Sequence, residues 1–99
     1  GRNATILDFG CGAGRMVRYL GQMDDVDAHA IDINPELVKW CKKYLTDVTT
    51  TQNTAAPPMP LPDATFDMVY SLSIFTHLPE DMTQAWLEDI GRVLKPGGR

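Results

Sequence analysis

A glycine-rich segment near the start of the chain is the first feature that points to chemistry. It reads Gly10-Cys11-Gly12-Ala13-Gly14, between an apolar segment at 4–9 and a segment with helical spacing. Glycine lets a backbone turn sharply and approach a ligand closely. A strand, such a loop and a helix in succession are typical of sites that bind nucleotide-like cofactors.

Two aspartates accompany this loop. Asp8 precedes it by two residues, and Asp32 lies 20 residues after Gly12, at the end of the next strand-like segment. A carboxylate at the position of Asp32 can accept hydrogen bonds from ribose hydroxyls. Two cofactors fit this much of the pattern: a dinucleotide such as NAD, and S-adenosylmethionine.

The loop itself favours S-adenosylmethionine. The dinucleotide fingerprint Gly-x-Gly-x-x-Gly/Ala needs a small last residue for close packing of helix on strand, and this chain has Arg15 there. Asp8 would repel a pyrophosphate, whereas it would attract the ammonium and sulfonium groups of S-adenosylmethionine. An NAD-binding oxidoreductase domain remains the alternative.

The other reactive residue types give weaker indications. His77 follows Phe75-Thr76 near the mouth of the expected cleft, where it would serve as a general base or brace the following helix. The catalytic residue is otherwise unassigned, and His29 is expected to be structural. Cys11 and Cys41 match no metal-ligand spacing, so no metal site is predicted. Reduced cysteines suggest a cytoplasmic protein.

The elements that must position these residues follow from the pattern of apolar side chains. Strands are expected at 4–9, 26–31, 48–52 and 66–72, and helices at 14–22, after the N-cap Asn34, and after Pro79. Met16 is expected on the apolar face of the first helix and Tyr44 on that of the second, while Pro96-Gly97-Gly98 is expected to end the third. Trp40 and Trp86 are expected to serve in packing. Residues 55–63 contain four prolines and predict an extended loop. This alternation predicts an α/β fold: a Rossmann-like open parallel sheet with helices on both faces.

Composition bounds the possible functions. The chain has 99 residues, of which 43% are hydrophobic and 22% charged, and this fits one globular domain. The net charge of −4 gives no electrostatic footprint for nucleic acid or an anionic membrane. The abrupt ends of the sequence suggest that residues 1–99 are the core domain of a longer chain.

Four segments resemble, in order, the motifs of one enzyme family, the class I S-adenosylmethionine-dependent methyltransferases. Residues 6–15 resemble the family's first motif, 31–35 the end of its second strand, 61–70 the entry to its fourth strand, and 92–98 the turn before its fifth. Together they cover nearly the whole chain. The resemblance implies part of a seven-stranded methyltransferase fold, whose C-terminal strands would lie after Arg99.

The resemblance also implies roles for individual residues. The methionine end of the cofactor would be held by Asp8, Phe9, Gly10, Cys11, Gly12, Ala13 and Gly14. Asp32 would bind the ribose and Ile33 would pack on the adenine. The family often has an acidic residue after the third strand, where this chain offers Asn53 and Thr54 instead. Ser71 would lie beside the methionine or the methyl group.

The predicted activity is transfer of the sulfonium methyl group to a nucleophile held in line with it. Such a transfer needs positioning more than a protein nucleophile. The fourth strand ends Tyr70-Ser71-Leu72-Ser73, without the Asn/Asp-Pro-Pro-aromatic element that marks amino methylation of bases or Gln in the family. With the acidic charge, this favours a small-molecule acceptor. A non-catalytic module that keeps the fold is a further alternative.

Overall fold

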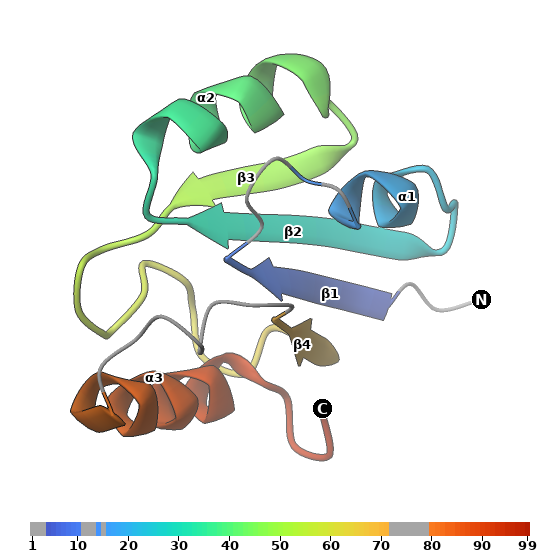
Figure 1. Ribbon diagram of the computed structural model, residues 1–99. Coiled ribbons are helices and arrows are strands. Elements are labelled where there is room, and N and C mark those ends of the chain that lie inside the picture. The colour runs from blue at the N-terminus through green and yellow to red at the C-terminus, as the bar shows by residue number, and fades with distance from the viewer. Residues whose placement is uncertain (1–3, 11–13, 15, 72–79) are drawn as a thin grey trace.

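The computed structural model describes residues 4–10, 14, 16–71 and 80–99 and shows a four-stranded parallel sheet in the order β3-β2-β1-β4. Figure 1 shows β1, β2 and β3 ending on the same side of the molecule, where the loop after β3 lies. The elements, in chain order, are β1 (Ala4–Phe9), α1 (Val17–Gly21), β2 (Val26–Asp32), α2 (Pro35–Tyr44), β3 (Val48–Gln52), β4 (Met68–Tyr70) and α3 (Glu80–Val93).

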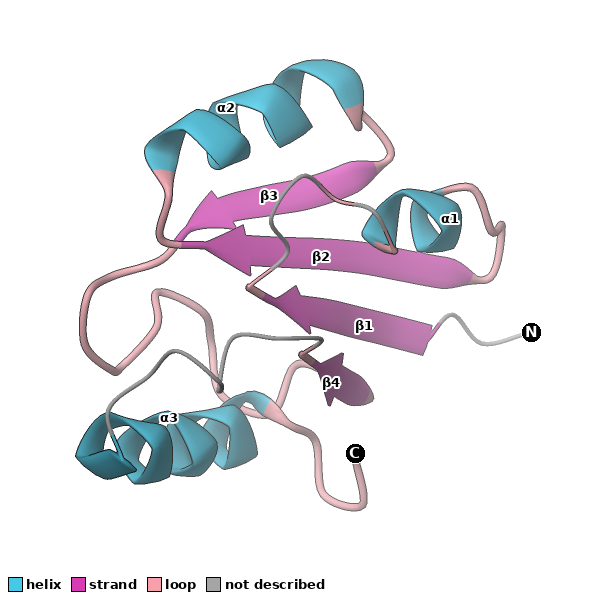
Figure 2. Cartoon of the chain, in the orientation of Figure 1, coloured by secondary structure: helices cyan, strands magenta, loops and turns pink. Residues whose placement is uncertain are grey.

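Helices cover both faces of this sheet, so the predicted fold class is confirmed (Figure 2). On one face, α1 and α2 pack on β2 and β3 around Val17, Ala30 and Cys41. On the other face, α3 packs Trp86 and Val93 against Leu7, Phe9 and other residues of the second apolar core. Among the described residues, no helix is both long and apolar enough to cross a membrane.

Helix α2 begins where the sequence predicts. The side-chain oxygen of Asn34 accepts hydrogen bonds from the backbone N–H groups of Glu36, at 2.9 Å, and Leu37, at 3.4 Å. Pro35 occupies the first turn, where it has no intrahelical hydrogen bond to lose. The chain therefore turns away from the end of β2 directly after Asp32, which leaves that carboxylate at the sheet edge.

Several predicted boundaries and faces were wrong. Helix α1 covers only Val17–Gly21, and Met16 is exposed instead of packed. On α2, Tyr44 was expected on the apolar face but is exposed. Trp40 is also exposed and packs on Tyr44, with ring centroids 5.2 Å apart and planes at 41°. The large apolar side chains of α2 extend beyond the face of the helix that is buried on the sheet, so these two side chains pack on each other.

The fourth strand is shorter than predicted. Only Met68–Tyr70 pairs with β1, while Phe66 makes a parallel bridge to Leu94. The backbone N–H of Phe66 donates to the carbonyl of Val93, and the N–H of Lys95 donates to the carbonyl of Phe66. This pairing ends α3 at Val93, before the Pro96-Gly97-Gly98 turn that was expected to end it.

The proline-rich loop is extended, as predicted, and is attached to α3 by buried polar contacts. The carboxylate of Asp89 accepts a hydrogen bond from the backbone N–H of Met59 at 2.7 Å. Arg92 donates to Asp89 at 2.7 Å, to the carbonyls of Met59 and Leu61, and to Asp63 at 2.6 Å. Every carbonyl and carboxylate in this group thus has a donor, and the loop after β3 is fixed against the helix.

Candidate active site

A hollow lies at the carboxyl ends of β1, β2 and β3, the edge where open parallel sheets bind ligands. Its cavity volume is about 50 Å³, and its mouth is open to solvent. The residues that line it are Phe9, Gly10, Asp32, Ile33, Asn53, Thr54, Ala55 and Trp86.

Asp32 is the charged group of the hollow. It is the last residue of β2 and is only 8% exposed. One carboxylate oxygen, Oδ1, accepts a hydrogen bond from the backbone N–H of Asn34 at 2.9 Å, which fixes the side chain against the start of α2. The backbone carbonyl of Asp32 accepts from the N–H of Asn53 at 2.8 Å. The carboxylate is therefore rigidly placed for a ligand that carries hydroxyl donors.

Asn53 and Thr54 face Asp32 from the loop after β3, where the sequence analysis expected adenine-binding residues. The Oδ1 atom of Asn53 accepts a hydrogen bond from the backbone N–H of Thr54 at 2.9 Å. The hydroxyl of Thr54 donates to the carbonyl of Ala56 at 2.7 Å. These bonds orient the amide of Asn53 so that its NH₂ group remains the donor available to a ligand.

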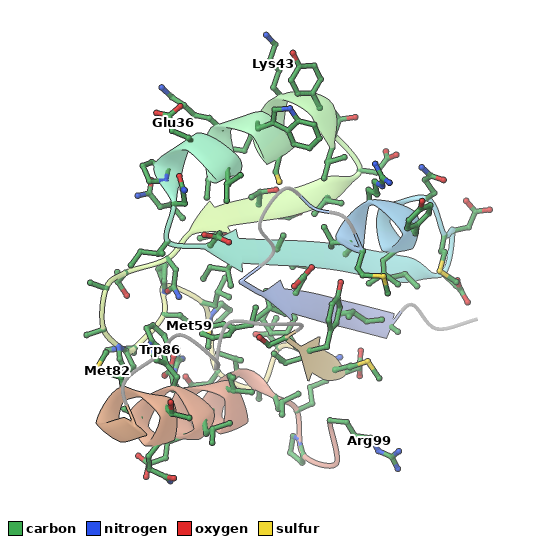
Figure 3. The ribbon with its side chains drawn as sticks, viewed as in Figure 1. Glu36, Lys43, Met59, Met82, Trp86 and Arg99 are labelled. Atoms are coloured by element: carbon green, nitrogen blue, oxygen red, sulfur yellow. The ribbon has the colours of Figure 1, made fainter. Side chains whose placement is uncertain are left out.

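The apolar part of the hollow comes from Phe9, Ile33 and Trp86. The rings of Phe9 and Trp86 lie 5.3 Å apart at 54°. Ile33, which is 48% exposed, also lines the hollow. Figure 3 shows Trp86 with Met59 and Met82 where α3 meets the loop after β3. The sequence analysis assigned Trp86 to packing alone, whereas it packs in the core and also lines the hollow.

Asp8 lies on the face of the sheet that α1 and α2 cover, in register with Ala30. It is 2% exposed, and its Oδ2 atom accepts a hydrogen bond from the Tyr70 hydroxyl at 3.0 Å. Burial raises the pKa of Asp8 from 3.8 to about 6; the Tyr70 hydrogen bond lowers that pKa, and the charge of Asp32 raises it. Within the described part of the chain, Oδ1 accepts no hydrogen bond.

The described glycines of the loop show why glycine is needed there. Gly10 and Gly14 have φ values of +78° and +75°, in the left-handed region that side chains disfavour. A Cβ atom on Gly14 would also collide with the side chain of Leu45 and lie 3.5 Å from Cys41 Sγ. Gly14 thus lies against Leu45 and Cys41 of the second helical segment.

Gly14→Ala is expected to lower the free energy of unfolding by about 2 kcal/mol, because backbone strain at positive φ adds to the displacement of Leu45. Urea unfolding followed by circular dichroism measures this loss. The matched control is Gly91→Ala, whose Cβ would meet nothing within 4 Å and whose helical position favours Ala. Equal stability of the two variants would contradict the strain argument.

The structure brings most of the predicted site residues together at one edge of the sheet. Asp32, Ile33, Asn53 and Thr54 line the hollow with Phe9 and Gly10, while Asp8 is buried on the face of the sheet that α1 and α2 cover. Ser71 follows β4, and its buried hydroxyl has no hydrogen-bond partner among the described residues. The predictions for Cys11, Gly12, Ala13 and the general base His77 fall outside the described residues.

The similarity of this chain to known proteins identifies its family. Residues 6–98 match the family model described as a methyltransferase domain. This chain belongs to that methyltransferase family. The resemblance to the class I S-adenosylmethionine-dependent enzymes, drawn from four sequence motifs, is thereby confirmed.

Curated relatives of the family include methyltransferases of small molecules. The chain is 33% identical, over 96 residues, to the 2-methyl-6-phytyl-1,4-hydroquinone methyltransferase of Synechocystis sp.. It is also 33% identical, over 101 residues, to the 27-O-demethylrifamycin SV methyltransferase of Amycolatopsis mediterranei. Each match covers 95% of this chain but 30% and 36% of the relative, so the chain spans about a third of these proteins.

Solved methyltransferase structures share the fold. A TehB-like SAM-dependent methyltransferase from Corynebacterium glutamicum superposes with a TM-score of 0.86 at 29% identity, covering 99% of this chain and 53% of that one. A SAM-dependent methyltransferase from Aquifex aeolicus gives 0.80 at 32% identity, covering 96% and 53%. Both matches place this chain in the fold of S-adenosylmethionine-dependent enzymes.

Proposed function

We propose that this chain is the cofactor-binding core, residues 1–99, of a longer methyltransferase that transfers the methyl group of S-adenosylmethionine to a small-molecule acceptor. The observation that carries the proposal is the hollow at the strand ends, with a fixed carboxylate at one point and an apolar wall at another, in a chain of the methyltransferase family. The family match also favours this function over the NAD-binding alternative.

The described residues fit the adenosine half of the cofactor. The carboxylate of Asp32 lines the hollow and suits the ribose hydroxyls, since a carboxylate accepts several hydrogen bonds. Phe9, Ile33 and Trp86 supply the apolar surface on which a purine packs. The NH₂ group of Asn53 can donate to a ring nitrogen of the adenine, which replaces the acidic residue more usual in the family.

Asp8, the glycine loop and Ser71 fit the methionine half of the cofactor. Asp8 is a buried carboxylate with one oxygen, Oδ1, that accepts no hydrogen bond from the described residues. An unmatched buried acceptor is costly unless a donor reaches it, and the ammonium of the cofactor is such a donor. We assign Phe9, Gly10 and Gly14, with Cys11, Gly12 and Ala13, to the loop that encloses this end, and Ser71 to its far side.

The residues of this chain act by holding the cofactor and orienting it toward the acceptor. The bound cofactor supplies an activated methyl group on a sulfonium. Asp32 and Asp8 fix the two ends of the cofactor, so that the methyl group is held in one direction and the acceptor approaches in line. His77 remains a prediction for a base that takes the acceptor's proton, and a cytoplasmic location remains a prediction from the cysteines.

The class of acceptor is proposed from the family and the charge. Two relatives are named for a hydroquinone and for a rifamycin, both small molecules. The net charge of −4 adds no attraction for nucleic acid. We therefore propose a small organic acceptor with an oxygen, nitrogen or carbon nucleophile.

Asp32→Ala tests the proposed cofactor site. In the full-length protein, we expect calorimetry to give micromolar binding of S-adenosylhomocysteine and a loss of about 30-fold or more in the variant, because hydrogen bonds to a charged group contribute about 1.5–3 kcal/mol. NAD, titrated in parallel, is expected not to bind.

Asn34→Ala is the matched control for this substitution. Asp32 also accepts a hydrogen bond from the N–H of Asn34, so Asp32→Ala disturbs the start of α2 as well as the hollow. Asn34→Ala removes the helix cap itself, at about 1 kcal/mol of stability, but should change affinity less than threefold. Binding of NAD, or equal affinity of wild type and Asp32→Ala, would refute the proposed function.

A further inference from the structure

Tyr70 and Asp8 lie opposite each other on neighbouring strands. In the parallel pairing of β1 with β4, Asp8 is in register with Tyr70, and in the pairing with β2 it is in register with Ala30. Residues in register point to the same face of a sheet, and Ala30 belongs to the core under α1 and α2. The 3.0 Å hydrogen bond from Tyr70 to Asp8 Oδ2 therefore lies on the face of the sheet that α1 and α2 cover.

Few other groups act on this carboxylate. Among the described residues, Tyr70 on β4 and Asp32 on β2 are the titratable groups that influence it. Helices α1 and α2 contribute Val17 and the buried thiol of Cys41 to this face. The described residues around Asp8 thus supply its carboxylate with one hydrogen-bond donor, the Tyr70 hydroxyl, and one repelling charge, that of Asp32.

We propose that Tyr70 is a positioning residue for the cofactor: its hydroxyl holds one oxygen of Asp8 and keeps this carboxyl group ionised, leaving the other oxygen to bind the cofactor's ammonium. This inference rests on the proposed function. A buried carboxyl group tends to take up a proton, and a neutral carboxyl group attracts an ammonium far less than a carboxylate does. The phenol donor opposes that protonation because it stabilises the charged form.

Removing the hydroxyl should therefore weaken binding in a pH-dependent way. In Tyr70→Phe the pKa of Asp8 rises above its present value of about 6, by about one pH unit. Affinity for S-adenosylhomocysteine should then fall about fivefold at pH 6 and less than twofold at pH 8.5, where the carboxyl group is ionised in both proteins. The protonation of the ligand itself is the same for both proteins at each pH, so it cancels from the ratio of their affinities.

The control variant is Tyr44→Phe, which makes the same chemical change at an exposed side chain of α2. Its affinity should follow the wild type at every pH. Tyr70→Phe affinity that matches the wild type throughout, or that drops equally at all pH values, would overturn the proposal, because a merely structural role has no such pH dependence.

A second measurement is independent of ligand binding. The carboxyl carbon of Asp8, followed by NMR in full-length protein labelled at aspartate, should titrate near pH 6 in wild type and about one unit higher in Tyr70→Phe. An unchanged titration would overturn the positioning role even if the protein bound no cofactor. Absence of wild-type binding with a shifted titration would refute the proposed function but not the coupling of Tyr70 to Asp8.

Discussion

Asp8→Asn is expected to stabilise the folded protein at neutral pH while weakening its affinity for S-adenosylhomocysteine by about 10- to 100-fold. The wild-type carboxyl group is ionised at pH 7 although it is buried, and burial is the main reason that its pKa is raised from 3.8 to about 6. A neutral amide of the same shape avoids that desolvation. It also loses the charge that would attract the ammonium of the cofactor.

The pH dependence of this effect follows from linkage. A group whose pKa is raised by folding binds its proton more tightly in the folded state, so its favourable contribution is complete below about pH 3.8 and is lost as the pH rises through 6. The difference of about 2 pKa units corresponds to roughly 3 kcal/mol at pH 7. Thermal unfolding should show Asp8→Asn several degrees above wild type at pH 7.5 and level with it near pH 4.

Measurements with bound ligand and with a control variant separate the effect of Asp8→Asn on stability from its effect on cofactor binding. Saturating S-adenosylhomocysteine should raise the melting temperature of the wild type, since a ligand at 100 times its Kd adds about 2.7 kcal/mol. The same concentration should add only about 0.4–1.4 kcal/mol to Asp8→Asn, because its affinity is about 10- to 100-fold weaker. Asp24→Asn, at an exposed turn, should alter neither quantity. A variant less stable than wild type at pH 7.5 would contradict the assignment of Asp8 as a strained, functional carboxylate.

The residues next to the strand ends were predictable because their positions follow from local chemistry. The glycine loop, Asp32 and the Asn34-Pro35 helix start each carry their own signal in consecutive residues. Parallel strands then bring them to one edge, whatever the details of packing. The roles of Ile33, Asn53 and Thr54 came from the resemblance to the family, and these residues line the hollow because they lie just after β2 and β3.

Contacts between distant segments were not predictable from one sequence. Tyr70 reaches Asp8 because of the register between β1 and β4, and a shift of one residue would turn it to the other face. Trp86 lines the hollow because α3 packs it against Phe9 of β1, although its helical spacing indicates packing alone. Short-range patterns also cannot show that the pairing of Phe66 with Leu94 ends α3 early.

Asp89→Ala should cause a large loss of stability, about 3 kcal/mol. Asp89 is 7% exposed and accepts hydrogen bonds from the backbone N–H of Met59 and from Arg92, so its removal leaves a buried donor unmatched and a cation without its buried partner. Urea unfolding of the full-length protein measures the loss. Asp89→Asn should lose less, because its carbonyl oxygen still accepts from Met59.

The neighbouring acid provides the matched comparison for this effect. Glu88 is exposed on the same turn of α3 and accepts a 3.4 Å hydrogen bond from Gln84, so Glu88→Ala should change stability by less than about 0.5 kcal/mol. Because Asp89 attaches the loop that continues from Asn53 and Thr54, Asp89→Ala should also weaken S-adenosylhomocysteine binding severalfold. Equal unfolding free energies for the two variants would show that the proline-rich loop does not depend on Asp89 for its attachment to α3.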